Sequence, residues 1–239
     1  MVMMFMSYCT TYAQMKLSPS AKVVEQQWLK PSSTEMIWYI MRDTITTEIG
    51  KVVSDIKLHD QYLMIVTQVR MKGMNSVWID SSIALSSTLQ PVYHASYNMQ
   101  RDMVLRFGEI IQGYYTDKVK KTTTIIADTV AQGYFDSNLY PFLVRWLPLQ
   151  DGYTAGMGIY DYNPATKGIV GATITNVTSG VYQSAKSGKH AVWLVSVNDG
   201  LDKQGNSSST YFIDKETRQL WKQEIVAGGR KMLMVCNEK

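Results

Sequence analysis

Metal binding would depend on three histidines and two cysteines: His59, His94, His190, Cys9 and Cys236. No two of them lie within five residues of one another, and neither an HExxH nor a CxxC motif occurs. Zinc sites usually draw on ligands at such short spacings, so the pattern predicts no metal site. Each histidine falls in or beside a predicted strand, where we expect it to be structural or exposed.

Other cofactor-binding motifs are also missing. The loop from Asp199 to Asn206 contains two acids, but it lacks the ligand spacing of a calcium loop, and Lys203 opposes a cation. Gly156 and Gly158 fall within a strand pattern, and no GxxxxGK motif occurs that could bind a phosphate. We therefore predict no cofactor.

Nucleophilic catalysis has no sequence signature here either. There is no GxSxG motif, and no SxxK with its partner motifs. Asp151, Asp161 or Glu109 could supply paired carboxylates for glycoside cleavage, but a chain with 20 acidic residues always offers such pairs. A Ser–His–Asp triad can assemble from distant positions, so a hydrolase stays open as a third alternative. We assign no catalytic residue and predict that the protein is not an enzyme.

The N-terminal segment Met1–Gln14 carries no charged residue, and its first six residues are apolar. Thr11 and Ala13 place small residues where a signal peptidase reads them. The pattern favours a signal-peptide remnant over residues 1–13, followed by one antiparallel β domain over 14–239, in a periplasmic or secreted protein. The alternative is a frayed native N-terminus.

The two cysteines give little support for a lipid anchor or a disulfide. Tyr8 precedes Cys9, whereas a lipid-modified cysteine normally follows small residues. If the signal is removed, Cys236 is left alone and no intramolecular disulfide can form. Cys236 lies in an apolar strand, which favours a buried small side chain over a nucleophile.

Composition is that of a globular protein, with 45% hydrophobic and 18% charged residues. The net charge is +4, and the one tight basic cluster is Lys118, Lys120 and Lys121. We interpret this cluster as the solvated face of a strand, so we predict no nucleic-acid partner. No apolar run approaches the roughly 18 residues of a membrane-spanning helix.

Alternation of apolar and polar residues dominates the chain and predicts many short strands. The predicted strands are 36–42, 44–57, 61–71, 77–79, 92–97, 104–107, 110–115, 122–127, 153–162, 169–177, 190–197, 210–214, 219–226 and 231–235. Two stretches have helical spacing instead: Ser20–Leu29 and, more strongly, Ser137–Leu147. Asp136 or Ser137 can cap the second helix, and Pro148 ends it.

Short connections favour antiparallel neighbours, and the absence of βαβ alternation makes a parallel sheet improbable. The apolar stripe of the 137–147 helix needs a partner surface. We therefore predict a mainly β fold: a large antiparallel half-open β-barrel of about a dozen strands, with one central helix against its concave face. A sandwich with the helix across one end is the alternative.

The helix stripe is also the candidate ligand site. Leu139, Phe142, Leu143 and Trp146 would either fill the core or line a hydrophobic cavity between helix and sheet. The sequence leaves both readings open.

Three stretches resemble a group of secreted bacterial proteins of unknown function. They are Phe135–Tyr153, with a helix followed by Leu-Pro-Leu and a strand; Tyr211–Leu220; and Thr88–Pro91. The aromatic–Ile–Asp–turn–Leu pattern of the second stretch is similar to one in the periplasmic lipoprotein carrier and its outer-membrane receptor. The resemblance spans most of residues 37–235.

This resemblance implies an unclosed antiparallel β-barrel with helical cover in the cell envelope, and it transfers no catalytic residue. Because the lipoprotein carriers hold acyl chains in their concavity, it implies a lipid-like ligand or a lipoprotein as partner. We therefore expect a non-enzymatic envelope protein that binds such a ligand. The alternative is a structural or protein-interaction module with a filled core.

Overall fold

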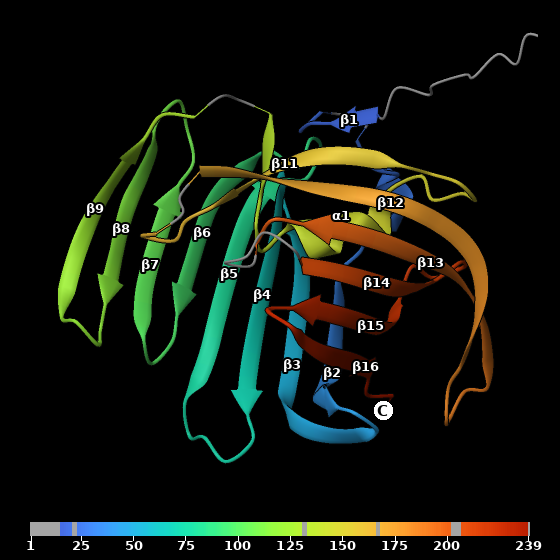
Figure 1. The fold of residues 1–239 in the computed structure, drawn as a ribbon. Coiled ribbons are helices and arrows are strands. Elements are labelled where there is room, and N and C mark those ends of the chain that lie inside the picture. The colour runs from blue at the N-terminus through green and yellow to red at the C-terminus, as the bar shows by residue number, and fades with distance from the viewer. Residues whose placement is uncertain (1–14, 21–22, 131–132, 166–167, 202–206, 239) are drawn as a thin grey trace, which may run out of the picture.

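The structure is a computed structural model that describes residues 15–20, 23–130, 133–165, 168–201 and 207–238. Within these residues it contains sixteen strands, one α-helix and one short 3-10 helix (Figure 1). The predicted signal segment 1–13, Cys9 and the cation-opposing Lys203 lie outside the described residues.

The first half of the chain is an antiparallel meander of eight strands, in which each strand pairs with the next. We call it the first meander. Its strands are β2 (Ser32–Arg42), β3 (Ile45–His59), β4 (Tyr62–Met71), β5 (Val77–Leu85), β6 (Pro91–Tyr97), β7 (Arg101–Arg106), β8 (Ile111–Asp117) and β9 (Thr122–Asp128).

The second half of the chain forms another meander, which returns to the first. We call it the second meander. Its strands are β11 (Ala155–Asp161), β12 (Gly168–Gln183), β13 (Lys189–Asp199), β14 (Ser207–Asp214), β15 (Leu220–Ala227) and β16 (Arg230–Cys236). Strand β16 pairs antiparallel with β2, with Met234 opposite Trp38, so both meanders belong to one sheet.

Two further strands, each of three residues, pair in parallel with β11: β1 (Met15–Leu17) and β10 (Tyr134–Asp136). The sequence analysis missed both, because three residues are too few to show an alternating pattern. Each strand that it did predict overlaps an observed strand. The observed total of sixteen therefore exceeds the predicted dozen.

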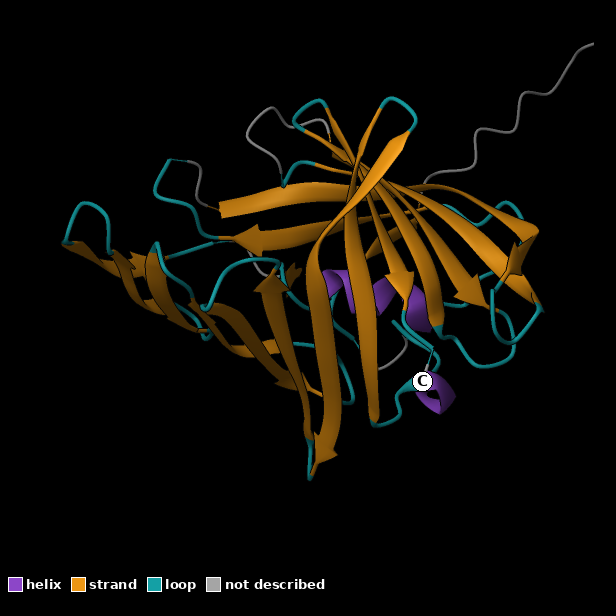
Figure 2. Cartoon of the chain, turned by 90° about the horizontal axis from the view of Figure 1, so that it is seen from below, coloured by secondary structure: helices purple, strands orange, loops and turns teal. Residues whose placement is uncertain are grey.

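The sheet curls but does not close. Its order runs from β1 through β11 and the second meander, then through the first meander to β9, and β9 does not pair with β1. Helix α1 (Tyr140–Trp146) lies in the hollow of this curl (Figure 2). The predicted half-open β-barrel with a helix on its concave face is confirmed.

Helix α1 is shorter than the predicted 137–147. Pro141 occupies its first turn, and the extended backbone of Leu147 ends it just before Pro148. No side chain caps its N-terminus. Asp136 does not cap the helix, because its two carboxylate oxygens contact His94 and Ser82. Of the other predicted helix, Ser20–Leu29, the described residues contain only the 3-10 turn η1 (Gln26–Trp28), so the prediction of an α-helix there was wrong for residues 23–29.

The main core forms where α1 faces both meanders. Leu139, Leu143 and Trp146 are buried there against β-strand residues such as Leu63 and Val195. A smaller cluster lies under the outer strands β7–β9, around Met103 and Tyr160. In the described part of the chain, no helix is both long enough and apolar enough to cross a membrane.

Candidate functional site

A cavity of about 150 Å³ lies between α1 and the concave face of the sheet. We call it the concave cavity. It is lined by both meanders and by the segment that leads into α1. Its lining residues are Thr34, Met36, Val52, Ser54, Thr67, Asn138, Pro141, Phe142, Arg145, Leu220, Gln223 and Met234.

Strand alternation explains this lining. Side chains two apart on a strand point to the same face, and β2 supplies Thr34 and Met36 while β3 supplies Val52 and Ser54. Leu220 and Met234 close the wall from β15 and β16. Strands from opposite ends of the chain therefore lie side by side in one wall of the cavity, because β16 pairs with β2, and α1 covers this wall.

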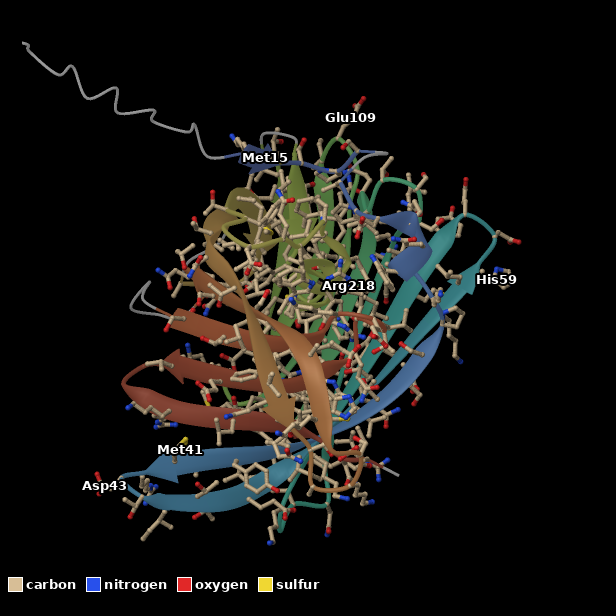
Figure 3. All side chains as sticks on the ribbon, turned by 90° about the vertical axis from the view of Figure 1, so that its right-hand side faces the viewer. Met15, Met41, Asp43, His59, Glu109 and Arg218 are labelled. Atoms are coloured by element: carbon tan, nitrogen blue, oxygen red, sulfur yellow. The ribbon has the colours of Figure 1, made fainter. Side chains whose placement is uncertain are left out.

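Two larger hollows lie elsewhere on the molecule. One, of about 570 Å³, is formed by the hairpin tips around Met41, Asp43 and Arg230. Figure 3 shows Met41 and Asp43 at the periphery, far from the covered core. The other, of about 430 Å³, runs over β1, β11 and β12. Neither is covered by α1, so we take the concave cavity as the candidate site.

Arg145 gives the concave cavity its charge. It lies on α1 with 7% of its surface exposed, and its Nε donates a hydrogen bond to the carbonyl oxygen of Arg218 at 2.9 Å. This is the one hydrogen bond that Arg145 makes among the described residues. Burial lowers the pKa of the guanidinium to about 10, because water no longer stabilises its charge.

Arg218, at the turn before β15, is a second buried arginine, but it has a partner. Its Nη2 lies 3.2 Å from Glu25 Oε2, and its guanidinium stacks over the Trp28 ring at 4.8 Å. Trp28 Nε1 donates to the same Glu25 oxygen at 2.6 Å. Figure 3 shows Arg218 near the middle of the molecule. Arg218 thus holds η1 in place, whereas Arg145 faces the cavity.

The polar side of the cavity leads into a buried hydrogen-bond chain. Asn138 Nδ2 donates to Ser82 Oγ at 2.9 Å, Ser82 donates to Asp136, and Asp136 Oδ1 lies 2.6 Å from His94 Nδ1. Burial disfavours a charged His94, but the Asp136 carboxylate more than compensates, so the pKa of His94 is raised. The hydroxyl of Thr67, on the cavity wall, is buried without a hydrogen-bond partner.

The sequence-predicted ligand residues separate into two groups. Phe142 lines the cavity, whereas Leu139, Leu143 and Trp146 are buried in the main core behind it. That a ligand touches any of the four stays a prediction. Sequence analysis missed Arg145, although it is the one charged residue between Asp136 and Asp151. A single arginine in an otherwise uncharged stretch of this length was the available signal.

The remaining histidines lie away from the cavity. His59 is exposed at the β3–β4 tip beside Asp60 (Figure 3). His190 Nε2 contacts Ser187 Oγ at 2.7 Å, and His190 Nδ1 lies 3.5 Å from Asp214 Oδ2. The three residues thus follow the Ser–His–Asp order of a catalytic triad. Ser187 is on an exposed turn.

The turn around Ser187 is poorly suited to acyl transfer. The backbone N–H groups of Lys186 and Ser187 both donate to Ser184 Oγ, so they are not free to stabilise an oxyanion. Asp214 accepts hydrogen bonds from the backbone of Glu216 and from other groups of its own hairpin. The contacts are those of a structured hairpin.

The structure also places the other groups that the sequence singled out, which are Cys236 and the basic lysine cluster. Cys236 is half-buried in β16, where burial raises the pKa of its thiol. The basic cluster Lys118, Lys120 and Lys121 lies in the turn between β8 and β9, so the predicted strand face was wrong. Lys118 pairs with Asp102 of β7, and Lys120 pairs with Asp117 at the end of β8. Among the residues that the structure describes, no three His, Cys, Asp or Glu side chains are grouped so as to hold a metal ion.

Comparisons with known proteins agree with this fold. The family described as "Protein of unknown function (DUF3108)" matches residues 34–235. A crystal structure of a β-barrel-like protein of domain of unknown function DUF1849 from Brucella abortus is similar, with a TM-score of 0.52 and 10% sequence identity. The similarity covers 94% of this chain and 98% of that one, and at this identity it shows the fold alone. No curated protein matches the sequence.

Proposed function

Given that the chain belongs to the DUF3108 family of proteins of unknown function, we propose that it is a non-enzymatic envelope protein that binds a lipid-like ligand, or the acyl chain of a lipoprotein, in the concave cavity. The observation that carries the proposal is the cavity itself. It is enclosed by α1 on one side and by strands of both meanders on the other, and most of its wall is apolar. Ligand sites are typically concave, largely apolar and furnished with a few polar groups.

The location in the cell envelope is part of the same proposal. It is supported by the uncharged N-terminal segment, whose small residues fit a signal-peptidase site. The half-open barrel also resembles the shape in which lipoprotein carriers hold acyl chains, which is an analogy of fold.

A direct test is to extract the purified protein with organic solvent, to identify lipids by mass spectrometry, and to titrate it with N-phenyl-1-naphthylamine, a neutral dye that fluoresces in apolar sites. We expect saturable dye binding to the wild type. Val52→Phe places a larger ring in the cavity and should weaken binding about tenfold or more. The matched control is Val53→Phe, on the opposite face of the same strand. No co-purified lipid together with no dye binding would refute the proposal.

A second candidate function is a protein-interaction module, which is favoured by the outer end of the first meander. The last strand of the first meander, β9, pairs with no described strand on its outer side, and Ile125 on this strand is 77% exposed. Unpaired strand edges can accept a strand from another protein. Capture of one defined envelope protein, lost in Ile125→Lys but kept in Val52→Phe, would favour this function over ligand binding.

The hydrolase alternative can be tested at Ser187, because its contact with His190 is the closest approach to a catalytic pair. We expect no labelling by a fluorophosphonate probe. Labelling that disappears in Ser187→Ala would contradict the non-enzymatic proposal.

A further inference from the structure

The concave cavity contains an arginine, Arg145, that has no counter-ion among the residues that the structure describes. No carboxylate pairs with Arg145 among the described residues, and its two terminal nitrogens form no hydrogen bond there. Arg218, which is buried to a similar extent, has Glu25 as its partner. The fold thus neutralises one buried arginine and leaves the charge of the other to face the cavity.

An uncompensated buried charge is costly. Removing an ion from water costs several kcal/mol even after the protein relaxes, and this cost is offset only by a counter-charge with good hydrogen bonds. Methionine or leucine would fill the position of Arg145 without that cost. The lowered pKa of Arg145 has the same physical origin, since burial disfavours the charged form.

We propose that the ligand of the concave cavity is an amphiphile with an anionic headgroup, and that Arg145 binds this headgroup. The inference rests on the proposed ligand-binding function and adds the chemical class of the ligand. A guanidinium offers a planar pair of N–H donors that matches a carboxylate or a phosphate. A carboxylate and a phosphate both accept these hydrogen bonds, and a competition experiment distinguishes the two.

The surroundings of Arg145 fit the two ends of such a molecule. In the same cavity, Thr67 supplies a buried hydroxyl that has no hydrogen-bond partner among the described residues, and Asn138 is held by its bond to Ser82. For the apolar chain, Met36 and Met234 offer flexible thioether walls. The volume of about 150 Å³ is comparable with an engineered cavity that takes up benzene, so only the first few carbons of a chain would be enclosed.

The test is a competition experiment on the full chain with four six-carbon compounds: hexanoate, hexyl phosphate, hexan-1-ol and hexylamine. Each displaces N-phenyl-1-naphthylamine from the wild-type protein. We expect at least one of the two anions to displace the dye at a concentration about tenfold to hundredfold lower than hexan-1-ol, because hydrogen bonds to charged groups are worth this much. Hexylamine should be the weakest. The stronger anion identifies the headgroup as carboxylate or phosphate.

Variants then assign the preference to Arg145. The preference is the concentration of hexan-1-ol that displaces the dye, divided by the concentration of the stronger anion that does so. In Arg145→Met this ratio should fall to within about threefold of one, while Arg145→Lys should retain part of the wild-type preference. The control is Arg106→Met, which removes an exposed arginine of β7 and should keep the wild-type ratio. The ratio is read within each variant, so a general loss of dye binding does not mimic the effect.

The outcomes separate this inference from the proposed function. Equal displacement by hexan-1-ol and both anions in the wild type would overturn the anionic headgroup and leave apolar ligand binding standing, and that comparison needs no folded variant. A preference for anions that persists in Arg145→Met would overturn the role of Arg145. Absence of dye binding in the wild type would overturn both proposals.

Discussion

Two regions of this sheet, the part beneath α1 and the outer end at β9, have the same alternating pattern but lie in opposite environments. Beneath α1, Leu143 is fully buried and both meanders contribute to one continuous core. At the outer strands, Ile125 of β9 and Val119 of the β8–β9 turn are about three-quarters exposed, at 77% and 75%. The difference is whether the face is covered. On β9 itself, Ile126 is 4% exposed because it packs in the cluster with Tyr134 and Tyr160 of β10 and β11, whereas the neighbouring Ile125 points to the opposite face, which is open to solvent. A sheet face becomes an interior only where a second element covers it.

The same contrast is seen in two His–Asp pairs. His94 and Asp136 are almost fully buried and 2.6 Å apart, whereas His59 and Asp60 are 3.1 Å apart on an exposed hairpin tip. Burial removes the screening by water that makes exposed ion pairs weak. Substitutions of apolar and of charged side chains should therefore both cost more stability in the covered region than in the exposed one.

The largest expected effect is at the centre of the covered region. Trp146→Ala should lower the free energy of unfolding by about 3–5 kcal/mol, because it leaves a large cavity in a packed core. Its counterpart Ile125→Ala, at the exposed end, should change it by less than about 0.5 kcal/mol. Urea denaturation followed by tryptophan fluorescence and circular dichroism measures both. Similar losses of unfolding free energy at the two sites would contradict the difference in burial between Trp146 and Ile125.

Next in size is the buried charge pair. Asp136→Asn removes the carboxylate that compensates His94, which we expect to cost about 3 kcal/mol, at the lower end of the range for breaking a buried pair. Asp60→Asn at the exposed pair should cost under about 0.5 kcal/mol. Denaturation midpoints at neutral pH compare the two. A cost for Asp136→Asn as small as for Asp60→Asn would mean that water reaches the pair.

A smaller, pH-dependent effect follows from His94. Its folded-state pKa is raised above 6.5 because Asp136, with Asp80 and Asp161 further off, faces it. The folded state therefore binds this proton more tightly than the unfolded state. The resulting stability is full below about pH 6.5 and is lost as the pH rises through the folded-state pKa of His94.

The measurement is the difference in unfolding free energy between wild type and His94→Gln from pH 6 to pH 9. It should shrink as the pH rises. Titrations of other groups cancel in this difference. A difference that stays constant, or grows with pH, would contradict the raised pKa.

The smallest expected change in stability comes from adding charge to the exposed end. The double variant Val119→Lys, Ile125→Lys should unfold within about 0.5 kcal/mol of wild type, since both side chains already contact water. A marked loss of stability would show that this end is covered in solution.

Most of the fold could be predicted from local pattern. Alternation identified the long strands, and the stripe from Leu139 to Trp146 identified the helix and its need for a concave partner surface. The parallel strands β1 and β10 could not be found, because their pairing with β11 leaves no mark in three residues.

The candidate site was predicted only in part. The helix placed Phe142 on the cavity, but the other wall comes from strands β2–β4, β15 and β16, whose meeting is a property of topology. The pairing of His94 with Asp136 joins residues 42 positions apart on β6 and β10. The periodicity of a sequence cannot predict such long-range contacts. That Arg145 has no counter-ion among the described residues likewise becomes visible only in the tertiary structure.

The pairing of β16 with β2 makes the fold depend on a contact between the two ends of the sequence. The whole first meander precedes Met234 in the chain, yet Met234 pairs with Trp38 at its beginning. Contacts between such distant positions form slowly. Until β15 and β16 join the sheet, the cavity lacks Leu220, Gln223 and Met234, so its wall is complete only when the last strands of the chain are in place.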